Sequence, residues 1–220
     1  MRDLNQLIIK FDYEQNFKDN DFYVSKSNKH IYSLLSNWPK WEKNFLNIIG
    51  EKFSGKSHLA DIFLRKFKGI KFNANSIKDE DLKKIKIYEN IVLEDFNKNI
   101  DEKLIYSLFN IIDQDNKFIV VTSVLPIVDI DFLLPDLKSR TKNFLLQFIE
   151  KPDDDLIFAL ILKNLSDRQI SLDRKLIDYI IKRIERSYSK IFDFIYKIDE
   201  LSLKKKKSID FKIIKEALGD

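Results

Sequence analysis

One eight-residue stretch constrains the fold of this chain more than any other. It matches the pattern G-x-x-x-x-G-K-S without a mismatch, through residues Gly50, Glu51, Lys52, Phe53, Ser54, Gly55, Lys56 and Ser57. The apolar run 45–49 leads into it, and an apolar-periodic segment from Leu59 to Phe67 follows. This order predicts a strand, a tight loop and a helix, which is the context that a phosphate-binding loop requires.

The residue types of this loop define its expected chemistry. Glycines let backbone N–H groups turn toward phosphate oxygens, and the start of the following helix adds partial positive charge. We expect Lys56 to reach the β- and γ-phosphates, the Ser57 hydroxyl to ligate Mg²⁺, and His58 to lie beside the nucleotide. The alternative is an ordinary strand–helix turn, but the chain has only 4 glycines and two of them stand in this register. The loop therefore predicts a bound nucleotide with Mg²⁺.

Composition excludes several classes of protein. The chain of 220 residues is long enough for one α/β domain and a small helical appendage. It has no cysteine, so it forms neither disulfides nor thiolate metal sites, and its two histidines are too few for a zinc site. No apolar run approaches a membrane span, so we expect a cytoplasmic protein without a membrane partner. The net charge of +4 is weak evidence for direct nucleic-acid binding.

Alternating apolar runs and helical patterns predict βαβ units between residues 21 and 150. Several of the apolar runs are continuous, as expected when both faces of a parallel sheet are covered. After a first helix, the expected strands are 44–49, 69–73, 90–94, 117–122 and 143–149. The expected helices are 27–36, 56–67, 78–85, 101–115 and 129–139.

From residue 151 onward the strand signal disappears and amphipathic helices follow. We expect them at 153–166, 173–185, 188–202 and 209–218, with Ser208 capping the last one. The predicted organisation is a tail (1–20), a nucleotide-binding α/β domain (21–150) and a small all-helical lid (151–220).

Two carboxylates end the expected strand 90–94. Glu94 is a candidate Mg²⁺ ligand together with Ser57, and Asp95 is a candidate catalytic residue that orients water. The usual order places Asp first, and the longer Glu94 side chain would alter the metal geometry, because Mg²⁺ tolerates little deviation from an octahedron. The alternative is a strand that happens to end in acids.

Ser123 and Arg140 are further candidates whose roles stay open at this point. Ser123 ends a strand that is expected beside the loop strand, where it either senses the nucleotide or simply precedes a turn. Arg140 ends a short helix at the edge of the domain. It is either an arginine finger that acts in a neighbouring molecule or a surface arginine near a helix C-terminus.

The chain resembles the AAA+ ATPases and, within them, the replication initiator DnaA and its shortened regulatory relatives of the Hda type. The resemblance covers residues 20–220. Its most specific pieces are the Trp38-Pro39-x-Trp41 step and the segment Leu134-Pro135-Asp136-Leu137-x-Ser139-Arg140. It implies a three-layer P-loop AAA+ domain with a parallel five-stranded sheet, followed by the helical lid.

The resemblance also implies partners. In Hda-type proteins a short N-terminal peptide binds the DNA polymerase sliding clamp, and Gln6, Leu7, Ile9 and Phe11 match such a peptide. The alternative for these residues is an apolar tail that packs on its own domain. An Hda-type protein would dock on ATP-bound DnaA, present Arg140 to its nucleotide and prevent re-initiation. It would reach DNA only through the clamp and could also form a homo-oligomer.

One departure from the family lies in the lid. The family's lid arginine contacts the phosphates, whereas this chain has Ser189 at that position and Lys190 beside it. The resemblance therefore implies weak or no ATPase activity, with Lys190 as the candidate lid contact. Two rival hypotheses remain: a DNA-binding AAA+ ATPase related to helicase loaders, with residues 204–207 as a lysine cluster, and an adaptor that binds no nucleotide.

Overall fold

The structure is a computed structural model that describes residues 22–168 and 170–219. Five strands form one parallel sheet in the order β2-β3-β4-β1-β5. The strands are β1 (Phe45–Ile49), β2 (Ile70–Asn73), β3 (Asn90–Phe96), β4 (Phe118–Ser123) and β5 (Leu145–Phe148). Because β1 lies between β4 and β5, the loop that follows β1 lies at the carboxyl edge of the sheet, between the ends of these two strands.

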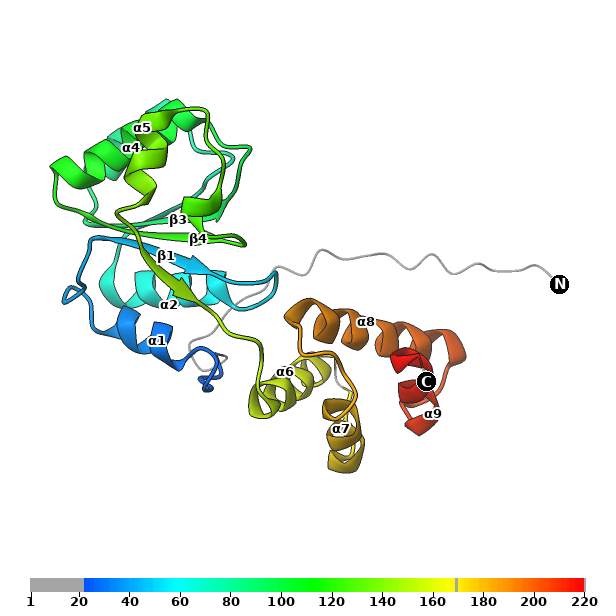
Figure 1. The fold of residues 1–220 in the computed structure, drawn as a ribbon. Helices are drawn as coiled ribbons and strands as arrows, with labels where there is room; N and C mark the ends of the chain where they lie inside the picture. Colours follow the sequence, from blue (N-terminus) through cyan, green and yellow to red (C-terminus); the bar gives the residue numbers. More distant parts are fainter. Residues whose placement is uncertain (1–21, 169, 220) are drawn as a thin grey trace.

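Helices cover both faces of the sheet, which gives three layers (Figure 1). On one face lie α1 (Lys29–Ser36) and α2 (Lys56–Phe67), and on the other lie α3 (Asp79–Ile85), α4 (Glu102–Gln114) and α5 (Pro135–Thr141). The central strands β1 and β4 and most of β3 are buried on both sides because their side chains alternate between two cores. Ile91 and Leu93 pack with α4, whereas Val92 packs with α2. The predicted α/β class and sheet are confirmed.

Four further helices follow the sheet and have their own core. They are α6 (Asp154–Asp167), α7 (Arg174–Ile181), α8 (Tyr188–Lys205) and α9 (Phe211–Leu218). Their buried apolar residues, from Ile157 to Ala217, pack together. Leu156 and Tyr188 instead join the core under α1 and α2, so the lid rests on the sheet layer at this point.

The helix predicted at 129–139 is wrong at its start. A short 3-10 turn, η2 (Ile127–Asp129), comes first, and α5 begins only at Pro135, whose fixed φ suits the first helical position. The carboxylate of Glu102 on α4 accepts hydrogen bonds from Leu133 N (3.0 Å) and Leu134 N (2.6 Å) and fixes the non-helical segment between them. This long-range contact cannot be read from local periodicity.

Two lid predictions also need correction. Asp210, and not Ser208, caps α9, since its carboxylate accepts a hydrogen bond from Ile213 N at 2.9 Å. The helix predicted to run to residue 185 ends at Ile181. No helix among residues 22–168 and 170–219 is long and apolar enough to span a membrane.

Candidate nucleotide site

The loop between β1 and α2 lies at the carboxyl edge of the sheet, and both of its glycines stand where a side chain is disfavoured. Gly55 has a φ of +93°, a conformation that side-chain-bearing residues rarely adopt. A Cβ at Gly50 would come within 2.5 Å of Ser54 Oγ. The loop therefore closes tightly. Ser54 Oγ is buried inside it and has no hydrogen-bond partner among the described residues. An orphaned hydroxyl in a tight cradle fits a loop that wraps phosphate oxygens.

Lys56 lies at the end of this loop, where α2 begins. Its Nζ donates hydrogen bonds to the carbonyl oxygens of Gly50 and Glu51, both at 2.8 Å. Burial lowers the pKa of Lys56, against the opposing attraction of Asp95, Glu51 and Glu94. A desolvated ammonium group gains most from a fully charged anion, so the position of Lys56 suits a phosphate group.

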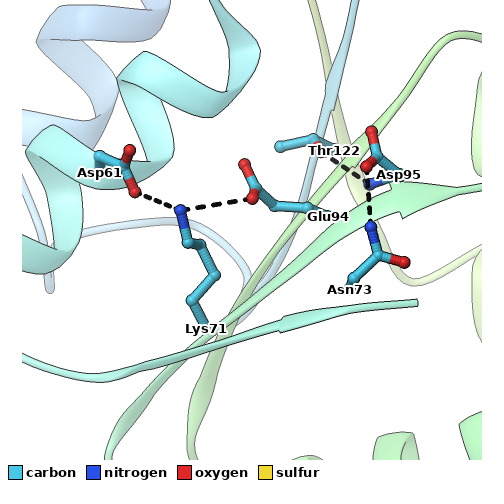
Figure 2. A network of polar contacts seen from close by, with 6 residues as sticks. All are labelled: Asp61, Lys71, Asn73, Glu94, Asp95 and Thr122. Carbon is cyan, nitrogen blue, oxygen red and sulfur yellow. Dashed lines mark hydrogen bonds and ion pairs between the residues drawn. The ribbon is translucent and has the colours of Figure 1, made fainter. Parts of the chain in front are cut away.

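Glu94 and Asp95 point in different directions (Figure 2). Glu94 Oε2 lies 3.4 Å from Lys71 Nζ, which also contacts Asp61 Oδ1 on α2 at 2.6 Å. Burial opposes the charge of Lys71, but the hydrogen bond to Asp61 and the attraction of Glu94 outweigh it, and the pKa of Lys71 is raised. Lys71 was not among the residues predicted from the sequence, where its signal is a charged residue inside a short apolar strand.

Asp95 is held on the other side of this network. Its Oδ2 accepts a hydrogen bond from Asn73 Nδ2 at 2.8 Å, and its N–H donates to Thr122 Oγ1 at 3.2 Å. Its φ of +57° accompanies a register shift between β3 and β4, which turns its side chain out at the sheet edge. Asp95 is solvent-exposed and faces the edge where the loop lies.

The oxygen donors near the loop fit Mg²⁺. Glu94 Oε1 is buried and has no hydrogen-bond partner among the described residues, so it has a free lone pair for a cation. The Ser57 hydroxyl is a second hard oxygen donor. Within the described part of the chain, no cluster of three or more His, Cys, Asp or Glu could hold a metal alone. Any Mg²⁺ would therefore need phosphate oxygens or water to complete its coordination.

Ser123 reaches the loop through its backbone and not through its hydroxyl. Its carbonyl oxygen accepts a hydrogen bond from Gly50 N at 3.1 Å. Its Oγ accepts one from Asn47 Nδ2 at 2.9 Å, and Asn47 Oδ1 accepts from Ile127 N at 3.0 Å. Asn47 is fully buried in β1 and was not predicted from the sequence. The available signal was a single amide within the otherwise apolar strand.

Arg140 lies far from the loop of its own chain. Its Nη1 donates to Asp113 Oδ2 on α4 at 2.6 Å. α5 ends just before β5 begins, so Arg140 stands at the amino edge of the parallel sheet, whereas the loop follows the carboxyl end of β1. A five-residue strand separates these edges by roughly 15 Å of backbone. The structure therefore does not bring Arg140 together with the other candidate residues.

Comparison with known proteins finds similarity to the Hda lid domain and to DnaA. A family model described as the Hda lid domain matches residues 153–218. Over 240 aligned residues the chain is 24% identical to the chromosomal replication initiator protein DnaA of Buchnera aphidicola subsp. Cinara cedri, covering 97% of this chain and 55% of that protein. Residues 153–218 thus match the Hda lid domain, and most of the chain is similar to DnaA proteins at 24–26% identity.

Solved structures share the fold of this chain. Domain III of the Thermotoga maritima replication initiation protein DnaA aligns with a TM-score of 0.69 at 17% identity, covering 91% of this chain and 95% of that chain. AMPPCP-bound DnaA from Aquifex aeolicus aligns with a TM-score of 0.62 at 20% identity, covering 84% and 68%. The chain spans about half the length of the curated relatives it matches.

The lid touches the loop at the first turn of α8. Ser187 Oγ and Tyr188 N donate to the two carboxylate oxygens of Glu51, the latter at 2.9 Å. The Phe53 ring stacks on Phe192 of α8 at 4.8 Å. Lys190 lies in the same turn with an exposed side chain. Glu51 and Phe53 were predicted as loop residues, but no sequence signal pointed to these lid contacts.

The remaining candidates lie partly inside and partly outside the described residues. His58 is buried in α2 and its ring meets Phe22 edge-on at 5.1 Å, next to the loop. Lys52 is exposed, with Nζ 5.0 Å from the centre of the Phe53 ring. The candidate clamp-binding residues Gln6, Leu7, Ile9 and Phe11 lie outside the described residues.

Proposed function

We propose that this chain is a nucleotide-binding regulator of DNA replication initiation of the Hda type. It would dock on ATP-bound DnaA and promote hydrolysis there by supplying Arg140 in trans. The observation that carries this proposal is the separation of Arg140 from the chain's own loop. An arginine at the opposite sheet edge cannot serve its own nucleotide, but it is partly exposed to a partner that packs against α4 and α5.

In this proposal the loop holds ADP or ATP and fixes the docking conformation. Backbone N–H groups of residues 50–57 and Lys56 would bind the phosphates, with His58 and Ser123 next to them. The structural similarity to AMPPCP-bound DnaA from Aquifex aeolicus supports an adenine nucleotide as the ligand. Ser57 and Glu94 would hold Mg²⁺, which neutralises phosphate charge when bound.

The chain's own hydrolysis would be weak. Lys71 occupies one oxygen of Glu94 and so competes with any cation for that carboxylate. Asp95 would orient water, held by Asn73 and by Thr122 at the sheet edge. On the lid side, Ser189 stands at the position of the family's arginine, which leaves Lys190 as the candidate phosphate contact. These features support activation of a partner as the main activity.

The proposed partners are DnaA and the sliding clamp. The proposal divides the chain into a tail, a nucleotide-binding domain and a lid. Residues 6–11 would bind the clamp, and DNA would be reached only through it, in the cytoplasm. The rival, direct DNA binding, has one clustered candidate in residues 204–207. Within it, Lys205 pairs with Glu216 of α9 and Lys206 caps the C-terminus of α8, which favours a structural role.

A reconstituted turnover assay tests the proposal. ATP hydrolysis by DnaA is measured with this chain and with clamp loaded on DNA or left out. We expect stimulation that depends on the loaded clamp and is lost in a Leu7→Ala, Phe11→Ala variant. Stimulation that ignores the clamp, together with tight DNA binding that weakens steeply as salt rises, would favour the rival function.

A further inference from the structure

Two side chains of the phosphate loop reach out of the loop and into the lid. Glu51 and Phe53 occupy variable positions of the G-x-x-x-x-G-K-S motif, so phosphate binding by itself does not specify them. Both contact α8: Glu51 at its first turn and Phe53 at Phe192 further along the helix. The loop therefore has lid contacts at two points between Gly50 and Gly55.

The Glu51 contact is a charged helix cap. Its two oxygens accept hydrogen bonds from Ser187 Oγ and Tyr188 N at the start of α8. Burial opposes the charge of Glu51, but hydrogen bonds from Ser187, Tyr188 and Ser189 outweigh it and lower its pKa. An ionised carboxylate is favoured at a helix N-terminus, where free N–H groups and the helix dipole meet it.

The Phe53 contact involves a residue whose backbone conformation is uncommon for residues other than glycine. Its φ of +68° lies in the left-handed region, where residues other than glycine are uncommon. The ring lies 4.8 Å from the Phe192 ring at an interplanar angle of 28°, a stacked pair. The attraction between the two rings favours this position of Phe53 and offsets part of the cost of its backbone conformation.

We propose that Glu51 and Phe53, together with Ser187 and Phe192, form a clasp through which the lid holds the loop in its phosphate-binding shape. Glu51 and Phe53 are then positioning residues for nucleotide binding, although neither needs to touch the nucleotide. The inference rests on the proposed nucleotide binding by this loop. The inference adds a direct contact between the loop and the lid. It does not depend on the proposed action of Arg140 in a partner molecule.

The clasp has a reciprocal consequence. If the lid stabilises the loop shape that binds phosphate, bound nucleotide must stabilise the lid contact by the same free energy. Loosening α8 therefore weakens nucleotide binding, and nucleotide slows the opening of the first turn of α8. A contact that only supports the fold would lower stability without linking these two properties.

The test uses the full chain, ADP titration by calorimetry, and amide hydrogen exchange of residues 188–192 with and without ADP. Phe192→Ala and Ser187→Ala should each weaken ADP binding by roughly fivefold or more and abolish the added protection. Phe192→Tyr keeps the ring and should restore both. Asp154→Ala is the matched control, because it breaks the ion pair with Arg186 (2.6 Å) beside the same turn but leaves the clasp intact.

Unchanged exchange in β3 and β4 will show that each variant is folded. Wild-type ADP affinity in both Phe192→Ala and Ser187→Ala would overturn the clasp, as would equal weakening by Asp154→Ala. A wild-type chain that binds no ADP would also overturn it. None of these results decides the role of Arg140, which is tested by DnaA turnover, so failure of the clasp and failure of the proposed function are distinguishable.

Discussion

Arg140 on α5 and Asp113 on α4 form an ion pair, with Nη1 2.6 Å from Oδ2. The pair fixes the guanidinium group on the outer surface of the sheet layer, at the edge opposite the phosphate loop. Half of the Asp113 side chain is exposed, so in the proposed complex a partner's phosphate would compete with it for the arginine. In the proposal, the ion pair would therefore orient Arg140 in the free chain and break when the partner binds.

Removing the acid should release the arginine at little cost in stability. An exposed ion pair contributes ~0–1 kcal/mol, so Asp113→Ala should lower the melting temperature of a chain of this size by no more than about 4 °C. Stimulation of DnaA hydrolysis should stay at least at the wild-type level. If Asp113→Ala instead abolishes stimulation, the pair is required to orient Arg140 in the complex.

Lys56 should be required for nucleotide binding but not for folding. Lys56→Ala removes the ammonium group that would contact the phosphates of a bound nucleotide and should weaken ADP binding roughly tenfold or more, since hydrogen bonds to charged groups contribute ~1.5–3 kcal/mol. Calorimetric titration measures this directly. Lys43→Ala is the matched control, an exposed lysine before the opposite end of β1. Equal affinity of the Lys56→Ala and Lys43→Ala variants would contradict the nucleotide site.

The sequence predicts the layers of this fold because each layer has a local signal. Continuous apolar runs mark strands with two covered faces, and the loop motif fixes where β1 ends and α2 begins. The predicted start of α5 is wrong because it depends on Glu102, about thirty residues earlier in the chain. Such a contact has no local pattern.

The sequence predicts the candidate site, like the fold, where the residues have a local signal. The motif locates the loop, and the strand-end acids fall near Lys56 as expected for a parallel sheet. The partners of those residues are not predictable. Glu51 meets Ser187 and Tyr188 across more than 130 residues of sequence, and Glu94 meets Lys71 through strand pairing. Tertiary pairing of this kind leaves no periodicity to read.

Alkaline pH should destabilise the contact between lid and sheet layer through Tyr188. Burial raises the pKa of Tyr188 to about 12, with the nearby acids Asp153, Glu51 and Glu150 adding to it against a smaller opposing effect of Ser27. The folded state therefore favours the neutral phenol, whose hydroxyl donates to Glu150 O at 3.0 Å. Its stabilising effect is complete below pH 10 and is lost as the pH rises toward 12.

Tyr188→Phe isolates this effect. The variant lacks the hydrogen bond at every pH, but it has no phenol to ionise on unfolding. The free energy of unfolding of wild type minus that of Tyr188→Phe should therefore fall by roughly 1–3 kcal/mol between pH 9 and pH 12. Urea unfolding of both proteins across this range measures the difference. A difference that does not change with pH would show that Tyr188 ionises as freely in the folded chain as in the unfolded one.

The most direct test of the account is ATP turnover by DnaA with the loaded clamp and the Arg140→Ala variant of this chain. Lys142→Ala, an exposed cation two residues away, is the control. An arginine supplied in trans is worth ~10³–10⁵ in rate, so Arg140→Ala should reduce turnover to the unstimulated rate. Its own ADP affinity should be unchanged, because Arg140 lies at the opposite sheet edge. Full stimulation by Arg140→Ala would contradict the account.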